Sequence, residues 1–301
     1  MSLLKAWIKA SRFASQSYIF IPLFVGEMFY VMTGGHINWT VFAIVHLYGL
    51  FMQLYIIYAN DYADAKTDEL NETFTIFSGG SRVLVDGDLS RRALGIAAIA
   101  MAVLCVLAGV WLAVQFNRIY APLLIALGIL LLWMYSFGPV KLSYRGGGEF
   151  LQMLGIGIIL PLVGFYAQGG APSQFPMETL AVILPTQLAC AMATSIPDFS
   201  SDKQSHKRTF SVLLGRTRVR MLIIGLNLLA IGAFFAIRWA SFEELKMALP
   251  LFVLLGVAVS LFSLVKKIHG KWAIFLFVMF SIVLTLGLMG QLAYVASNMH
   301  S

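Results

Sequence analysis

Residues 60–68 read Asn60-Asp61-Tyr62-Ala63-Asp64-Ala65-Lys66-Thr67-Asp68 and directly follow a long apolar run. On a helix, Asp61, Asp64 and Asp68 lie at positions i, i+3 and i+7, so all three carboxylates point to one face. Anions that share a face repel one another, and a bound divalent cation reverses the sign of that interaction. Mg²⁺ in particular prefers a few carboxylates together with phosphate oxygens of a substrate. We therefore expect a metal site where this apolar run ends.

A second, shorter acidic motif is Asp198-Phe199-Ser200-Ser201-Asp202, with carboxylates at positions i and i+4. By itself it is as compatible with a solvated loop as with a binding site. Both motifs, however, follow apolar runs and precede basic residues. The pair predicts two acidic clamps at one membrane face that hold metal ions on a phosphorylated substrate.

The composition indicates a membrane protein. Of the 301 residues, 59% are hydrophobic and only 12% are charged, whereas soluble domains carry about 25% charged residues. We expect an all-α polytopic membrane protein with no cleaved signal peptide, and no nucleic-acid partner. Cys105 and Cys190 both lie within apolar runs and are expected to be inert packing residues.

Because a span needs about 20 predominantly apolar residues, the sequence predicts nine transmembrane helices around a central cavity. They are expected at residues 17–33, 40–60, 93–114, 120–137, 150–168, 179–197, 219–237, 247–265 and 272–297.

The positive charges alternate with these spans. All but three of the 21 Lys and Arg residues fall on the side of the N-terminus, and the exceptions are Arg118, Arg238 and Lys246. The positive-inside rule then places the N-terminus and the long polar loops in the cytoplasm and the C-terminus outside. We expect an integral protein of a bacterial inner (plasma) membrane.

The chain also contains a weak internal repeat. Asp64 and Asp68 correspond to Asp198 and Asp202, and each pair is followed by a basic loop. We expect one domain over residues 1–301, with motif-bearing halves at about residues 17–140 and 150–297 that face each other across the cavity.

Paired acidic motifs in an all-helical protein indicate ionisation of an allylic diphosphate. The carbon–oxygen bond breaks only when the departing negative charge is neutralised, which carboxylate-bound metal ions can do. Cationic side chains near the motifs can add hydrogen bonds to the phosphates; the candidates are Arg82, Lys141, Arg145, Lys207 and Arg208. A cavity within the membrane would shield the allylic cation from water.

At these residues the sequence resembles the UbiA superfamily of membrane prenyltransferases. Asn60-Asp61-x-x-Asp64-x-x-x-Asp68 matches the first signature of that family, and Asp198-x-x-x-Asp202 followed by Lys207-Arg208-Thr209 matches the second. The resemblance extends over almost the whole chain. It implies that the five aspartates hold Mg²⁺ on a prenyl diphosphate. Asn60 opens the signature and is expected either to bind the metal or a phosphate oxygen or to cap the helix.

Two further segments, Gly79-Gly80-Ser81-Arg82 and residues 135–149, resemble the branch of the superfamily that contains 1,4-dihydroxy-2-naphthoate polyprenyltransferases. By that resemblance, Tyr135 and Lys141 belong to a polar loop over the site. The implied reaction joins a prenyl group to an aromatic carbon and releases diphosphate, as in menaquinone-type biosynthesis.

Two departures keep another acceptor open. Arg12-Phe13 stands where many members of the family have Arg-Pro, and residues 194–197 replace the usual Asn-rich run. The same chemistry on a secondary-metabolite aromatic, such as a quinoline or a phenol, is therefore the alternative.

A secondary transporter is the alternative from another class, because internal repeats and intramembrane polar groups occur there too. Both acidic motifs lie at helix ends instead of at the membrane midplane, which disfavours a transporter.

Glu27 lies inside the first span, where a carboxylate is costly. It is either a tentative acceptor-binding residue or an interhelical contact.

Overall fold

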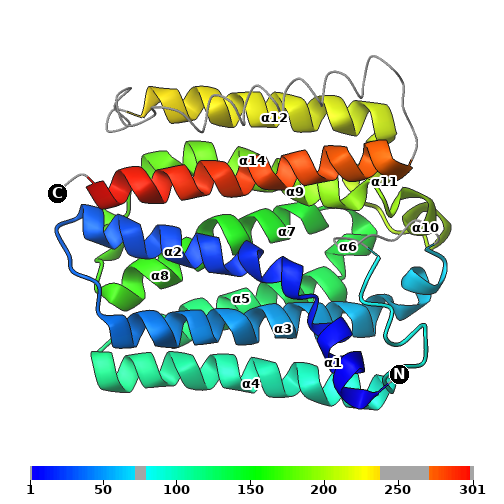
Figure 1. The fold of residues 1–301 in the computed structure, drawn as a ribbon, viewed down its shortest axis with the longest axis horizontal. Helices are drawn as coiled ribbons and strands as arrows, with labels where there is room; N and C mark the ends of the chain where they lie inside the picture. Colours follow the sequence, from blue (N-terminus) through cyan, green and yellow to red (C-terminus); the bar gives the residue numbers. More distant parts are fainter. Residues whose placement is uncertain (1, 72–78, 238–270, 299–301) are drawn as a thin grey trace.

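The computed structural model describes residues 2–71, 79–237 and 271–298, and throughout these ranges the regular elements are helices (Figure 1). The long elements of the first half are α2 (Ser17–Met32), α3 (Trp39–Glu69), α4 (Arg91–Phe116) and α5 (Ala121–Ser136). Those of the second half are α7 (Gly148–Leu154), the π-helical segment η2 (Gly155–Ile159), α8 (Leu160–Gln168), α9 (Leu180–Ser195), α12 (Arg216–Ala236) and α14 (Lys271–Asn298).

Short helices connect these elements or precede them. They are α1 (Leu3–Ser11), η1 (Phe13–Gln16), α6 (Leu142–Arg145), η3 (Pro172–Gln174), η4 (Met177–Thr179), α10 (Phe199–Gln204) and α11 (Phe210–Leu214).

Eight of the nine expected spans coincide with helices of the structure, with α7, η2 and α8 together forming the fifth. The expected span at 247–265 lies outside the described residues. Six of these helical stretches are long and apolar enough to cross a membrane, and α2 and α5 are shorter apolar helices. The chain is therefore an all-helical integral membrane protein.

The largest difference from the expected boundaries is at α3, which does not end at residue 60 but continues to Glu69. Its 31 residues span about 46 Å at 1.5 Å per residue, more than a hydrocarbon core of about 30 Å. The first acidic motif is therefore part of the same rigid helix that crosses the bilayer.

Helices distant in the sequence surround a common interior. Helix α2 packs against α8 and α14, α3 packs against α8, and α9 packs against α14. The contact between α2 and α8 is close because glycine allows it: a Cβ on Gly164 would collide with the carbonyl oxygen of Leu23, and one on Gly26 with that of Pro161.

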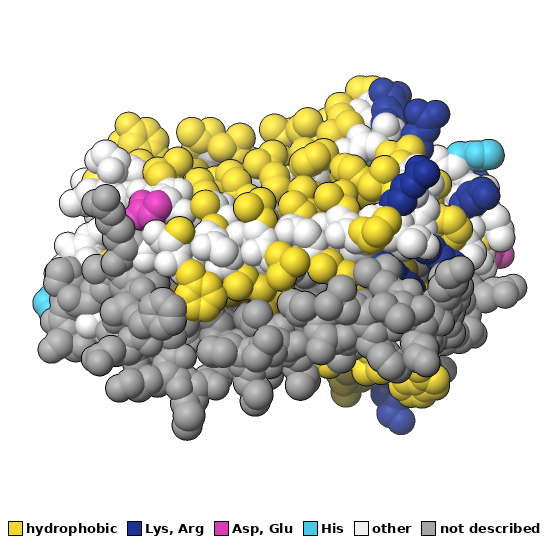
Figure 2. All heavy atoms as spheres, turned by 90° about the horizontal axis from the view of Figure 1, so that it is seen from above, with side chains coloured by type: hydrophobic (Ala, Val, Ile, Leu, Met, Phe, Trp, Pro, Cys, Tyr) yellow, Lys and Arg dark blue, Asp and Glu magenta, His cyan; other side chains and the backbone are white. Residues whose placement is uncertain are grey.

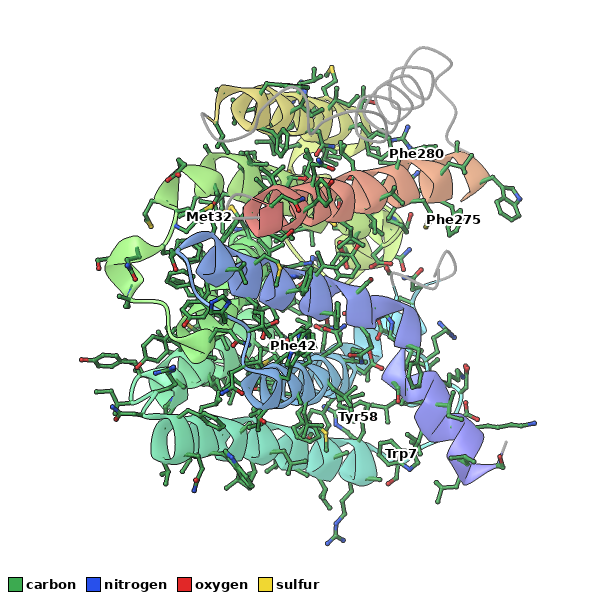
Figure 3. All side chains as sticks on the ribbon, turned by 60° about the vertical axis from the view of Figure 1, so that its left-hand side comes forward. Trp7, Met32, Phe42, Tyr58, Phe275 and Phe280 are labelled. Atoms are coloured by element: carbon green, nitrogen blue, oxygen red, sulfur yellow. The ribbon has the colours of Figure 1, made fainter. Side chains whose placement is uncertain are left out.

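Charge separates along the long axis of the bundle. On the face in Figure 2, hydrophobic side chains cover the middle, and Lys and Arg gather at the right-hand end. This is the end at which α1, α6, α10 and α11 lie in Figure 1, whereas α14 finishes at the opposite end. Helix α1 is held there by Trp7, whose ring meets that of Tyr58 of α3 edge-on at 5.6 Å (Figure 3).

Candidate active site

The first acidic motif lies on the last turns of α3. Since the helix is continuous through it, Asp61, Asp64 and Asp68 share one face as expected, and all three side chains are buried. Asn60 precedes them and accepts a hydrogen bond from the Ser136 hydroxyl over 3.4 Å.

The second motif begins where α9 has ended. Ile196 still has helical backbone angles, but Pro197 has no N–H to continue the helix, so α9 ends at Ser195 and the chain resumes as α10. Asp198 precedes the first turn of α10, and its carbonyl accepts the Asp202 N–H over 2.8 Å. The two carboxylates are therefore one helical turn apart.

Both motifs line one cavity with a volume of about 260 Å³. Its polar end contains Asp64 and Asp68 from α3 and Asp198 and Asp202 from the start of α10. The rest of its wall is mostly apolar and comes from α2, α3, α5, α7, η2, α8 and α9; it includes Ile19, Met52, Ile56, Leu131, Ile156, Ile159 and Leu160.

Direct contacts join the two motifs. The Lys207 ammonium lies 2.8 Å from Asp64 Oδ2 and 4.0 Å from Asp202 Oδ1. The side-chain amide of Asn71, just after α3, donates to Asp198 Oδ1 over 2.7 Å. The backbone N–H of Gly79 donates to Asp198 Oδ2 over 3.3 Å.

The segment Gly79–Ser81 folds over the first motif. Asp61 Oδ2 accepts the backbone N–H of Ser81 over 3.1 Å and also the Ser81 hydroxyl. Gly80 has a φ of +67°, and a Cβ there would collide with the Asp68 carboxylate, so this position requires glycine. Asp61 is not on the cavity wall; it orients the loop beside its neighbours.

The donor set fits divalent cations. The charged side chains that line the cavity are five acids, Asp64, Asp68, Glu149, Asp198 and Asp202, and two bases, Arg12 and Lys207. Asp61 Oδ1 is also buried without a hydrogen-bond partner. Among the described residues no three His, Cys, Asp or Glu side chains converge on a single point. Mg²⁺ usually takes one or two protein carboxylates and completes its shell with water and substrate phosphate, so it does not require such a group.

Burial and neighbouring charges shift the pKa values of the second motif and of Lys207. Burial raises the pKa of Asp202 to about 7 and also raises the pKa of Asp198. For Lys207, burial alone lowers the pKa, but the groups that face the ammonium, chiefly the Asp64 and Asp202 carboxylates, together outweigh burial and hold the pKa well above its ordinary value. Lys207 is therefore a permanent cation between the motifs.

Of the remaining basic candidates, none lines the cavity. Arg82 donates to the backbone carbonyls of Asp68 and Asn71 over 3.0 and 3.2 Å and so caps the end of α3. Lys141 lies over the ring of Tyr144 at 3.6 Å. Arg145 and Arg208 are exposed. The structure thus brings Lys207 to the aspartates and leaves these four at the periphery.

Tyrosines from two elements flank the site. Tyr135, near the end of α5, lines the cavity. The hydroxyl of Tyr144 donates to Asp64 Oδ1 over 3.2 Å and lies 2.7 Å from the Thr67 hydroxyl.

Among the residues of the site to which the sequence assigns no role are Arg12, Asn71, Ser81 and Tyr144. Arg12 and Asn71 lie just after helices that end at the cavity. Arg12, Ser81 and Tyr144 did have a sequence signal, because each lies in a segment that was compared with the family; Asn71 had none.

Glu27 lies elsewhere and is not part of the cavity wall. It is fully buried, His46 Nε2 lies 2.9 Å from one of its oxygens, and Gln168 Nε2 donates to the other over 2.9 Å. Glu27 thus connects α2, α3 and α8. Of the two possibilities considered from sequence, acceptor binding and an interhelical contact, this geometry corresponds to the interhelical contact.

Comparison with known proteins agrees with this geometry. The UbiA prenyltransferase family matches residues 19–282. Among curated proteins, 1,4-dihydroxy-2-naphthoate octaprenyltransferase of Bacillus subtilis is 22% identical over 202 residues, which cover 65% of this chain and 61% of that relative.

The fold also resembles solved structures. A UbiA homolog from Archaeoglobus fulgidus, bound to GPP and Mg²⁺, superposes with a TM-score of 0.65 at 15% identity over 96% of this chain and 99% of that one. The apo structure of a UbiA homolog from Aeropyrum pernix gives 0.65 at 16% identity, over 92% and 96%. The family match over most of the chain, together with two acidic motifs at one end of a shared cavity, shows that this protein belongs to the UbiA prenyltransferase family.

Proposed function

We propose that this protein transfers a prenyl group from an allylic prenyl diphosphate to a carbon of an aromatic acceptor and releases diphosphate. The observation that carries the proposal is the shape of one cavity. Four aspartates from two separate motifs line its polar end, and apolar side chains line most of the rest. Such a cavity matches a molecule with a charged head and a hydrocarbon tail.

The diphosphate head would lie between α3 and α10. Asp64, Asp68, Asp198 and Asp202 would hold Mg²⁺, with Asp61 as a further candidate through its unpartnered oxygen. Bound Mg²⁺ would supply the positive charge that stabilises diphosphate as a leaving group. The solved A. fulgidus homolog with GPP and Mg²⁺ supports this assignment.

The protein's own cations would complete the charge balance. Lys207 is within reach of both motifs, and Arg12 lines the same cavity. Both can donate charge-assisted hydrogen bonds to phosphate oxygens. Lys207 would then exchange a carboxylate partner for a phosphate, while Asn71 and Ser81 keep Asp198 and Asp61 oriented.

The reaction would begin when the bond between the allylic carbon and the diphosphate oxygen breaks and the oxygen keeps the electron pair. The apolar wall excludes water from the resulting allylic cation. An electron-rich ring carbon then forms the new carbon–carbon bond, and the ring regains aromaticity by losing a proton or carbon dioxide. Tyr135, Gln53 and Gln152 line the cavity and are candidates to orient the ring.

The best candidate acceptor is 1,4-dihydroxy-2-naphthoate, supported by the name of the B. subtilis relative. The matched region spans 61% of that relative at 22% identity, so a quinoline or a phenol stays the alternative. The gathering of Lys and Arg at the end that carries both motifs supports a cytoplasmic active site in a bacterial inner membrane.

A product screen tests the proposal. Membranes with the full-length protein are incubated with Mg²⁺, several prenyl diphosphates and naphthoate, benzoate, quinoline or phenol acceptors, and products are identified by mass spectrometry. We expect a prenylated aromatic from the wild type and none from Asp64→Asn or Asp198→Asn. Failure of every donor and acceptor pair, or full activity of either variant, contradicts the proposal.

A further inference from the structure

The apolar end of the cavity has a defined depth. Residues Tyr48, Met52, Ile56, Asn60 and Asp64 of α3 line it, each four positions after the one before. From Asp64 to Tyr48 is 16 residues, which corresponds to about 24 Å along the helix axis. The wall changes from carboxylate to hydrocarbon over that distance, in the direction that a prenyl tail would follow from its diphosphate.

At the far end, four residues from three elements meet. A Cβ placed on Gly128 of α5 would lie 3.2 Å from Met52 Cε, 3.7 Å from Ile159 Cγ2 and 3.9 Å from the Tyr48 hydroxyl. We call Tyr48, Met52, Gly128 and Ile159 the cavity floor. Tyr48 is fully buried and Met52 is 2% exposed. The cavity wall includes no residue of α3 before Tyr48 and none of α5 before Gly128.

The side chains of the cavity floor differ in how easily they can move. Tyr48 is a rigid ring, and its hydroxyl is buried without a hydrogen-bond partner among the described residues. Met52 is unbranched and can change rotamer. Gly128 has no side chain, and Met52 Cε packs close to the position that a Cβ would take, so a larger residue at 128 must displace Met52.

We propose that the cavity floor sets the length of the prenyl chain that the protein accepts, with Gly128 as the position that fixes the depth. This inference rests on the proposed function. A tail that ends above the floor fills the cavity without moving its wall. A longer tail must displace Met52 and press on Tyr48, and tightly packed interiors resist such displacement.

The alternative is that longer tails leave the cavity between two helices and enter the bilayer. In that case the floor would not influence chain length. Substitutions at the floor that change depth in opposite directions separate the two possibilities. Gly128→Val raises the floor, whereas Met52→Ala lowers it.

The experiment measures donor binding, which needs no acceptor. The full-length protein in lipid nanodiscs with Mg²⁺ binds radiolabelled geranyl diphosphate, and unlabelled dimethylallyl, farnesyl and geranylgeranyl diphosphates compete for it. Gly128→Val should lower the affinity for the geranylgeranyl donor relative to the dimethylallyl donor by about tenfold or more. Met52→Ala should shift the same ratio toward the longer donor.

Matched controls carry the same substitutions away from the cavity. Gly232→Val lies on α12, where a Cβ has nothing within 4 Å. Met192→Ala removes a buried methionine of α9 that is absent from the cavity wall. Both controls should keep the wild-type ratio.

Two results overturn the inference in different ways. If the wild type binds donors but neither floor variant moves the ratio, chain length is set elsewhere while the proposed function stands. If the wild type binds no prenyl diphosphate in the presence of Mg²⁺, the proposed function and the inference fall together.

Discussion

The ammonium of Lys207 lies 2.8 Å from a carboxylate oxygen of Asp64, so a residue that follows the second acidic motif forms an ion pair with the first. Both side chains are nearly inaccessible, at 10% and 2% exposure. The pair joins the segment after α10 to the end of α3 across the polar end of the cavity. It also places a cation where the charge of a substrate would have to be balanced.

Replacing Lys207 by methionine should destabilise the protein. The substitution leaves Asp64 buried near Asp68 and Asp202 without its counter-ion, and breaking such a pair costs about 3 kcal/mol or more. We expect a lower Tm in detergent that added Mg²⁺ partly restores, because the metal replaces the lost positive charge. Lys203→Met, at an exposed position of α10, is the control. An unchanged Tm for Lys207→Met contradicts the ion pair.

Asn71 should act by positioning Asp198. Its amide donates to Asp198 Oδ1, and groups that orient metal ligands typically contribute about 10-fold to 100-fold in metal affinity. Asn71→Ala should raise the Mg²⁺ concentration needed for half-maximal donor binding by about tenfold, with recovery at saturating Mg²⁺. The exposed Gln204→Ala serves as the comparison. A defect that saturating metal does not repair indicates another role.

Metal dependence should vary with pH because burial raises the pKa of Asp202 to about 7. A carboxyl group with a raised pKa is neutral below that value, and a neutral acid is a poor ligand for Mg²⁺. The Mg²⁺ concentration required for donor binding should therefore increase as the pH falls below about 7 and level off above it. A requirement that stays flat across that range argues against Asp202 as a ligand.

Glu27→Ala should affect stability and leave the chemistry intact. The change removes the acceptor of Gln168 Nε2 and the partner of His46 Nε2, at a cost of about 2 kcal/mol. We expect a lower Tm. The KM for the aromatic acceptor should stay unchanged. A rise in that KM without a change in Tm would indicate that Glu27 contributes to binding of the acceptor and would contradict a purely structural role.

Much of this molecule could be predicted from sequence because two of its signals are local. Hydropathy locates spans such as α4 and α12, since lipid requires a continuous apolar run. The spacing of Asp61, Asp64 and Asp68 defines a shared face on any helix. The contact between the two motifs could only be inferred from their chemistry, because they are more than 100 residues apart.

What could not be predicted depends on tertiary packing. The sequence does not show where the side chain of a basic residue near a motif points, so it cannot distinguish Lys207 from Arg208. In the structure Lys207 is buried and Arg208 is exposed. Asn71 and Tyr144 are ordinary loop residues until the fold brings them to Asp198 and Asp64. The sequence predicts an end of this span at residue 60 because polar residues follow it, whereas α3 continues to Glu69 because its polar side chains are buried against the rest of the fold.

The central claim is that the two acidic motifs together hold Mg²⁺ on a prenyl diphosphate. Its most direct test is equilibrium binding of radiolabelled geranyl diphosphate to wild type, Asp64→Asn and Asp198→Asn, before and after chelation of divalent metal. We predict that wild-type binding disappears with chelator and returns with Mg²⁺, and that each variant loses the Mg²⁺-dependent component. Equal binding with and without metal, or wild-type binding by either variant, would contradict the claim.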